Sequence, residues 1–194
     1  RLAQKHDKQF MYVRRHMNPD DAKAVLDLAI PGVRSEREFR RFYPHREVMA
    51  HVVGFTNLDE HGVEGMELAF DQWLTGEPGN QKVILDRDRR IVENVDLIRP
   101  ARNGKDLTLS IDRRIQYLAY SELKKSIKDN DARAGTAVVI EVKTGEVLAM
   151  VNYPSYNPNS RLAISPSLRR NAAVTDVLEP GSTMKPFTVA AALE

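Results

Sequence analysis

The stretch that decides the fold is Glu-Pro-Gly-Ser-Thr-Met-Lys-Pro, residues 179–186. Its Pro-Gly pair is a turn signal, and its last proline is tolerated only near the start of a helix because proline lacks a backbone N–H. The pattern therefore predicts a helix that starts near Ser182 or Thr183. The apolar residues 187–193 are typical of a buried helix.

Ser182 and Lys185 are the candidate catalytic pair. Residues three apart lie on one face of a helix, so we expect the lysine amine beside the serine hydroxyl. A serine is a weak nucleophile until a base takes its proton. An ordinary lysine titrates near 10.4, so a lysine base working near neutrality needs its pKa lowered by about three units, or roughly 4 kcal/mol. Burial and a helix N-terminus both act in that direction.

Two alternatives accompany this reading of the motif. The serine can be a helix N-cap with an exposed lysine behind it, and the Ser-x-x-Lys pattern alone is weak because Ser121 and Lys124 match it equally well. That second copy lies inside a long helical pattern, where we expect an ordinary serine and a solvated lysine. Context therefore favours Ser182 as the nucleophile, with its own backbone N–H as a candidate oxyanion donor.

Further motifs precede this stretch in a fixed order. They are Arg-Phe-Tyr-Pro (41–44), Ala-His-Val-Val-Gly-Phe (50–55), Gly-Val-Glu-Gly-Met-Glu-Leu-Ala-Phe-Asp (62–71), Thr-Gly-Glu-Val-Leu-Ala-Met (144–150) and Tyr-Pro-Ser-Tyr-Asn-Pro-Asn (153–159). Together with residues 179–186, this series resembles the class B penicillin-binding proteins, and among them the cell-division branch. The resemblance runs from about residue 10 to residue 194.

The resemblance implies a fold and a reaction. It implies an α+β non-catalytic module, of the pedestal or dimerisation type, over residues 1–99. Residues 100–194 would be the first part of an α/β transpeptidase domain, in which a sheet is flanked by helices. The given sequence stops shortly after the nucleophile helix of that domain begins. The implied reaction is peptidoglycan D,D-transpeptidation, in which Ser182 is acylated by a stem peptide or a β-lactam and Lys185 is the general base.

The resemblance also implies partners and a location. The partners are peptidoglycan stem peptides, β-lactam antibiotics and cell-division proteins that include a septal glycosyltransferase. The location is the periplasmic side of the bacterial inner membrane, through an anchor that this sequence does not contain. We interpret the chain as an internal piece of a longer protein. The family's Ser-x-Asn and later Lys-Thr-Gly motifs would follow Ser182, so we predict that this piece alone is inactive.

Lys143-Thr144-Gly145 is not that later motif, because it precedes the serine. We interpret it as a hairpin turn between strands over residues 135–142 and 146–152, although Lys-Thr-Gly is also a catalytic signature of penicillin-recognising enzymes. Two other functions are alternatives. One is a non-catalytic docking module for cell-division partners. The other, a β-lactamase, is disfavoured because those enzymes lack the long N-terminal module.

Composition excludes several classes of function. The chain of 194 residues has no cysteine, a formal net charge of +2 and a pI near 8.8, which is too mild a balance to indicate a nucleic-acid partner. Its five histidines show no metal-ligand spacing, and no glycine-rich phosphate loop is present, so no metal or cofactor is predicted. Five arginines between residues 34 and 46 fit either structural ion pairs or a partner-docking surface.

Hydrophobic periodicity and capping residues predict the remaining elements. The expected helices cover residues 19–30, 47–53 and 62–74, the last with Leu68, Phe70 and Trp73 in the core, and a long helix follows the cap Asp112. The expected strands are 81–85 paired with 91–97, a strand at 107–111, and the pair 135–142 and 146–152. Residues 152–170 are expected to form a long polar loop.

Overall fold

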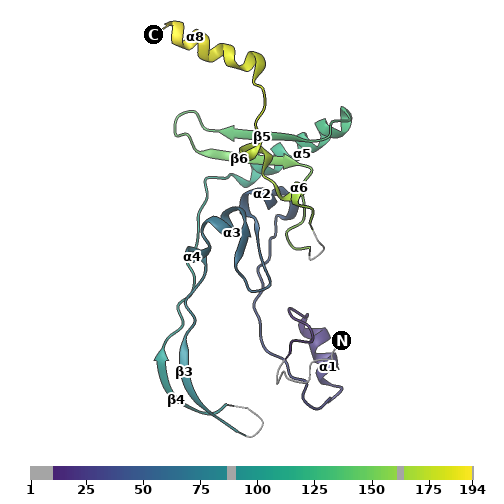
Figure 1. The fold of residues 1–194 in the computed structure, drawn as a ribbon, viewed down its shortest axis with the longest axis vertical. Helices are drawn as coiled ribbons and strands as arrows, with labels where there is room; N and C mark the ends of the chain where they lie inside the picture. The colour runs from purple at the N-terminus through teal and green to yellow at the C-terminus, as the bar shows by residue number, and fades with distance from the viewer. Residues whose placement is uncertain (1–10, 87–90, 161–163, 194) are drawn as a thin grey trace.

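The computed structural model describes residues 11–86, 91–160 and 164–193. The ribbon is elongated, with the hairpin of β3 (Asn80–Leu85) and β4 (Ile91–Arg99) near one end and helix α8 (Lys185–Leu193) at the other (Figure 1). The strands of the described residues form three separate two-stranded antiparallel sheets. The α+β character predicted for the first part of the chain is therefore confirmed.

The first helix begins where the sequence predicts. Helix α1 (Pro19–Leu26) has proline at its first position and acids in its first turn, an arrangement that suits the helix dipole. The helix ends earlier than the predicted stop at Pro31, and beyond its end Ala29 adopts a left-handed backbone with φ +49°. After a turn at residues 31–32, the chain has no regular secondary structure up to Tyr43.

The helix predicted over residues 62–74 is confirmed only in part, because two short helices replace one continuous helix. In its place the chain forms β2 (Gly62–Glu64), paired with β1 (Phe55–Thr56), and then the short helices α3 (Gly65–Ala69) and α4 (Asp71–Leu74). Gly65 prevents a continuous helix, because its φ of +61° is positive whereas residues inside an α-helix have a negative φ.

The apolar residues of these short helices also differ from expectation. Leu68, Phe70 and Trp73 are exposed by 54%, 41% and 46%, so they are not core residues. Trp73 instead lies under the Lys105 amine, 4.0 Å from the ring centroid, and its indole N–H donates to Asp106 O. The indole therefore ties α4 to the chain that leaves the hairpin.

Upstream of these helices, the predicted element at 47–53 is confirmed with a break. A 3₁₀ turn, η2 (Arg46–Val48), precedes helix α2 (Ala50–Val53), and the helix ends at Gly54 as expected. The β3–β4 hairpin is confirmed as well. Residues 87–90, between its two strands, lie outside the described residues.

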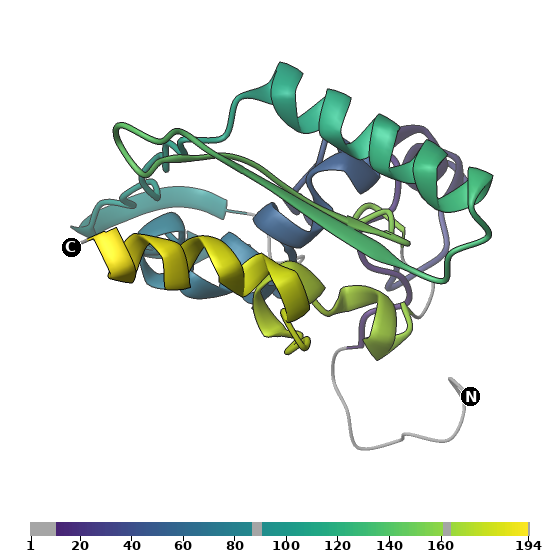
Figure 2. The ribbon, with the colours of Figure 1, turned by 90° about the horizontal axis from the view of Figure 1, so that it is seen from above.

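The second part of the chain is built on one long helix and one hairpin. Helix α5 (Arg113–Asp129) is capped as predicted by Asp112, whose carboxylate accepts from the backbone N–H of Arg114 and Ile115. Helix α5 lies across one face of the pair β5 (Gly135–Ile140) and β6 (Val147–Tyr153) (Figure 2). Because a Cβ at Gly135 would come within 2.8 Å of Ile127 Cδ1, the helix approaches the strands closely there.

The strand predicted at 107–111 is wrong. This segment lies beside the start of β6, where Ser110 Oγ donates to Val147 O and the Asp112 N–H donates to Leu148 O, but it forms no strand ladder. The core lies where α5, β6 and α2 meet. Its buried apolar side chains include Ala50, Val52, Tyr120, Ile127, Ala149, Val151 and Tyr156.

Residues 154–193 continue from β6 to the end of the described chain. The predicted polar loop contains helix α6 (Pro166–Arg169) and is followed by α7 (Ala172–Thr175), the 3₁₀ turn η3 (Gly181–Met184) and α8. The expectation that α8 is buried is wrong: none of its described residues is buried. Of the elements that the structure describes, only the adjacent turn η3 makes more than sparse contacts with α8, and Phe187 and Leu193 are exposed by 69% and 83%.

Candidate active site

The candidate nucleophile lies in a tight turn that the sequence dictates. Gly181 has a φ of +53°, which a residue without a side chain adopts at no steric cost. Thr183 closes the turn, because its N–H and its hydroxyl both donate to Pro180 O, at 3.2 and 2.6 Å. Ser182 is therefore held in η3, immediately before α8 begins, close to the predicted helix start.

The turn also brings the candidate base next to the serine. The Lys185 N–H donates to Ser182 O, which is the i to i+3 bond of a 3₁₀ helix. Side chains three residues apart are eclipsed in a 3₁₀ helix, so the two functional groups leave the same side of the turn. Both residues are exposed, and among the residues that the structure describes no hydrogen bond or ion pair engages Ser182 Oγ or Lys185 Nζ. The structure thus supplies the spacing but not the burial that we expected to lower the pKa of a lysine base.

The second Ser-x-x-Lys pattern lies in a helix interior as predicted, although its lysine is half-buried rather than fully solvated. Ser121 and Lys124 both lie inside α5, and the Lys124 amine is 6.0 Å from the centroid of the Tyr120 ring. A serine in a helix interior has no free helix terminus behind it. This copy therefore has no helix N-terminus to serve as an oxyanion site.

Lys143-Thr144-Gly145 is confirmed as a hairpin turn. It joins β5 to β6, with Gly145 at φ +77° and its N–H donating to Glu141 O at 2.8 Å. The Thr144 hydroxyl is occupied by the turn itself, since it accepts from the Glu146 N–H at 3.2 Å. The motif therefore forms the turn between β5 and β6 in this chain.

The segment that leads from β6 toward Ser182 docks on the N-terminal part of the chain. In residues 153–160, Ser155 Oγ donates to Glu47 O at 2.8 Å and Tyr156 OH donates to Ala50 O at 3.0 Å. The sequence does not predict this contact, although Ala50 lies in the motif at 50–55 and Ser155 and Tyr156 lie in the motif at 153–159. No signal in the sequence indicated that two motifs about a hundred residues apart contact each other.

His51 lies at the centre of this docked surface. The side chain is buried, its Nε2 lies 2.8 Å from Leu168 O, and its ring packs edge-on against Tyr156 with centroids 5.3 Å apart. Burial lowers the pKa of His51, while the contact with Leu168 O raises it by a smaller amount. The imidazole is therefore held in its neutral form, with Nε2–H as the donor.

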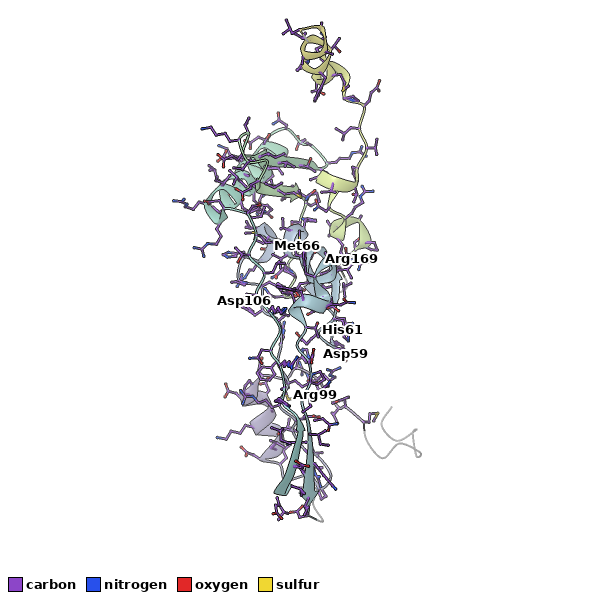
Figure 3. All side chains as sticks on the ribbon, turned by 90° about the vertical axis from the view of Figure 1, so that its left-hand side faces the viewer. Asp59, His61, Met66, Arg99, Asp106 and Arg169 are labelled. Atoms are coloured by element: carbon purple, nitrogen blue, oxygen red, sulfur yellow. The ribbon has the colours of Figure 1, made fainter. Side chains whose placement is uncertain are left out.

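Two acidic residues nearby show how the arginines are used. Glu67 is buried, and burial raises its pKa, although Arg41 lies 3.2 Å away and lowers it. Arg169 from α6 reaches Glu64 at 3.7 Å, and Figure 3 shows Arg169 at the level of Met66 in α3. The ion-pair interpretation therefore holds for Arg41 among the arginines between residues 34 and 46.

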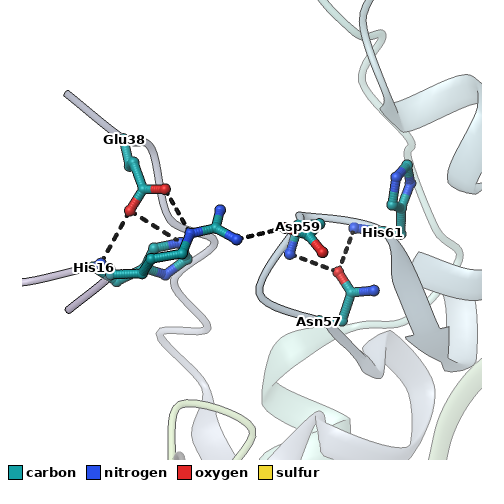
Figure 4. Close-up of polar contacts among 6 residues, drawn as sticks. His16, Glu38, Asn57, Asp59 and His61 are labelled. Atoms are coloured by element: carbon teal, nitrogen blue, oxygen red, sulfur yellow. Dashed lines mark hydrogen bonds and ion pairs between the residues drawn. The ribbon is translucent and has the colours of Figure 1, made fainter. Parts of the chain in front are cut away.

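A second polar cluster joins the α1 region to the β1–β2 turn (Figure 4). Arg15 donates to Glu38 at 2.7 Å and to Asp59 at 2.5 Å, and the His16 N–H donates to Glu38 at 3.1 Å. The hydrogen bond from the His16 N–H, followed by the one from Arg15, lowers the pKa of Glu38. Asn57 shapes the turn by accepting from the Asp59 N–H. The cluster is a structural connection that sequence analysis did not find.

The described residues hold no group of three or more His, Cys, Asp or Glu side chains that could bind a metal ion. Within the same residues, none of the helices is both long enough and apolar enough to cross a membrane.

Comparison with known proteins decides the family. Residues 2–109 match the penicillin-binding protein dimerisation domain, and residues 135–194 match the penicillin-binding protein transpeptidase domain. This chain belongs to the penicillin-binding proteins. The family resemblance and the fold class predicted from the sequence are therefore confirmed, whereas the boundary between residues 99 and 100 stays a prediction.

Relatives of this penicillin-binding protein extend the comparison. It is 47% identical over 186 residues to the peptidoglycan D,D-transpeptidase FtsI of Escherichia coli (strain K12), covering 96% of this chain and 32% of that protein. A peptidoglycan synthetase from Bifidobacterium adolescentis superposes with a TM-score of 0.65 at 26% identity, over 91% of this chain and 32% of that one. Penicillin binding protein 3 from Mycobacterium tuberculosis, complexed with aztreonam, gives a TM-score of 0.53 at 30% identity, over 64% and 24%. The chain spans about a third of the length of the curated relatives it matches.

Proposed function

We propose that the full-length protein carrying this chain is a serine-type peptidoglycan D,D-transpeptidase of cell division. The observation that carries the proposal is the turn at residues 181–185, in which Ser182 and Lys185 are joined by a 3₁₀ hydrogen bond. The transpeptidase family model includes this turn, and the relative FtsI is named as a transpeptidase. Ser182 is the nucleophile and Lys185 the general base.

The reaction is an acyl transfer in two halves. Ser182 Oγ attacks the penultimate D-alanine carbonyl carbon of a stem peptide while Lys185 Nζ takes the hydroxyl proton. The bond to the terminal D-alanine breaks, and that residue leaves with a proton returned by Lys185. An amine of a neighbouring stem then attacks the ester, forms the cross-link and returns the proton to Ser182.

A β-lactam enters the same first half-reaction. Its strained amide stands in for the donor carbonyl, and the ester that forms on Ser182 is hydrolysed slowly. The complex of Mycobacterium tuberculosis penicillin binding protein 3 with aztreonam supports β-lactams as ligands of this family. The protein would meet its stem-peptide substrates on the periplasmic side of the inner membrane, held there by an anchor outside this chain.

The test of the nucleophile is intact mass after incubation of the full-length protein with a penicillin. One adduct is expected on the parent and on Ser121→Ala, which changes the matched serine of the second Ser-x-x-Lys pattern, and none on Ser182→Ala. Lys185→Ala is expected to acylate about 10² to 10⁴ times more slowly, the usual contribution of a positioned base. An adduct on Ser182→Ala at the parent's rate would refute the proposal.

This chain alone is proposed to be inert. The hydroxyl and amine are exposed, whereas a preorganised site needs donors and excluded water around the reacting atoms. Incubation of the isolated chain with the same penicillin is expected to give no adduct while the full-length protein is fully acylated. Acylation of the isolated chain at a comparable rate would contradict this view.

A second function, docking of cell-division proteins such as a septal glycosyltransferase, is supported by the surface of the N-terminal part. Strand β4 exposes Val92, Leu97 and Ile98 by more than 60% each. Co-purification of division proteins with the full-length protein tests this role. Capture is expected to fall when all three are changed to serine and to persist in Ser182→Ala. Unchanged capture by the triple variant would exclude docking through β4.

A further inference from the structure

Asn159 joins the two parts of the chain through a reciprocal pair of hydrogen bonds. The Tyr43 N–H donates to Asn159 Oδ1 at 2.9 Å, and Asn159 Nδ2 donates to Tyr43 O at 2.7 Å. One side chain thus satisfies both backbone groups of a residue, as a neighbouring strand does in an antiparallel pair. Arg40 adds a third contact by donating to Asn159 O at 3.0 Å.

The same segment is held on one side of the η2–α2 region. Ser155 and Tyr156 reach Glu47 O and Ala50 O, so together with Tyr43 the attachment points are spaced by four and three residues. Glu47 belongs to η2 and Ala50 to α2, whereas Tyr43 precedes both elements. Apart from the Arg40 guanidinium, the docking uses backbone groups of the N-terminal part, and its strength therefore depends on the path of the backbone there.

The chain beyond this segment is tied to β6 before it reaches the nucleophile turn. Asn152 Nδ2 donates to Asn171 Oδ1 at 2.8 Å, and the Ala173 N–H donates to Asn152 Oδ1 at 2.9 Å. Helix α7 ends at Thr175, only seven residues before Ser182. On the way from β6 to the nucleophile, residues 155–159 are thus attached to the N-terminal part and residues 171–173 to β6.

We propose that Asn159 is a positioning residue for acyl transfer at Ser182. By locking residues 153–160 onto the Tyr43 backbone, it fixes the start of the chain that carries the nucleophile turn. A small misplacement of reacting atoms by a distant change lowers a rate strongly. The inference rests on the proposed acyl transfer, and it makes the N-terminal part a determinant of the reaction rate.

The experiment compares three asparagine variants of the full-length protein. Asn159→Ala removes both side-chain bonds to Tyr43. Asn159→Asp keeps the acceptor but turns a carboxylate oxygen toward Tyr43 O. Asn130→Ala is the matched control, because Asn130 Nδ2 also donates to a backbone oxygen, that of Ser126, but at the far end of α5. The readouts are the rate of acylation by a penicillin, kcat and KM with a stem-peptide donor, the Tm, and amide exchange at Tyr43.

The expected result is a split between rate and binding. Asn159→Ala and Asn159→Asp acylate about tenfold more slowly and lose kcat by a similar factor, with KM within about twofold, and the Tyr43 amide exchanges about tenfold faster. Asn130→Ala keeps the parent's rate. If Asn159→Ala does not fold, Asn159→Asp decides the question.

Two outcomes are distinguishable. Asn159 variants with a lowered Tm but the parent's acylation rate and kcat have lost only structural contacts, and the positioning role is overturned. An adduct on Ser182→Ala, by contrast, overturns the proposed function itself, whatever Asn159 does.

Discussion

The contacts of Gln116 join the two parts of this chain and can be tested by a single substitution. Its side chain is fully buried in α5, with Nε2 donating to Val48 O at 2.7 Å and to Met150 O at 2.9 Å. The Met150 N–H donates to Gln116 Oε1 at 2.8 Å. The amide therefore occupies the free edge of β6 in the way a third strand would, and it also reaches η2.

Replacing Gln116 with alanine leaves three backbone groups without a partner, namely Val48 O and the N–H and O of Met150. Each unpaired buried polar group costs about 1–3 kcal/mol. With some water entering the space, we expect a loss of about 3–5 kcal/mol in the local free energy of opening. Since 1.36 kcal/mol is a factor of ten, amide exchange in β6 should accelerate by at least about a hundredfold.

The assay is native-state amide exchange in the full-length protein, read at Met150 and its neighbours in β6. Gln72→Ala is the matched control, because Gln72 is an exposed glutamine on α4 and its change should stay within about 0.5 kcal/mol. An acceleration below about fivefold for Gln116→Ala would refute the reasoning, since the three contacts would then carry little energy.

Further predictions test the backbone and the buried histidine. Gly54→Ala should lower the free energy of unfolding by about 3 kcal/mol or more, because Gly54 has φ +79° and a Cβ there would lie 1.8 Å from Glu64 O. Gly145 has a similar φ of +77°, but a Cβ there would meet no atom within 4 Å. Gly145→Ala should therefore cost only about 1 kcal/mol. Urea unfolding compares the two, and equal losses would contradict the steric argument. Burial lowers the pKa of His51 in the folded state. As pH falls below about 6.5, the unfolded chain therefore binds more protons than the folded chain. The stability that is present above that pH is lost as pH falls through the lowered pKa. The fall in Tm from pH 7.5 to 5 should be smaller in His51→Gln than in the parent or in the exposed control His45→Gln; identical slopes in all three would remove His51 as the cause.

Local signals in the sequence predicted the elements that depend on neighbouring residues. Asp112 caps α5, Gly54 ends α2, and the Lys-Thr-Gly turn joins β5 to β6, since each depends on one side chain or one φ angle. The η3 turn at Ser182 follows from its Pro-Gly pair for the same reason.

Predictions that depended on tertiary partners were less accurate. The helix over 62–74 is interrupted because Gly62–Glu64 pairs with β1, a contact that periodicity does not report. Residues 107–111 have a strand-like composition but make only isolated bonds to β6. The apolar pattern of α8 predicted burial, yet amphipathicity states that a helix has an apolar face and not what covers it.

In the candidate site, too, the feature set by neighbouring residues could be predicted and the feature set by tertiary contacts could not. The spacing of Ser182 and Lys185 could be predicted, because it is a property of one turn. The contacts of Asn159, Tyr156 and His51, which hold the chain that leads to that turn, could not be predicted. They join residues more than a hundred positions apart.

The central claim is that Ser182 is the acylated residue, and peptide mapping tests it most directly. The full-length protein is incubated with a penicillin and digested with trypsin, and the adduct is located by mass spectrometry. We predict that the added mass lies on the peptide that begins at Asn171 and that fragmentation places it on Ser182. An adduct on the peptide that contains Ser121, or on no serine at all, would contradict the account.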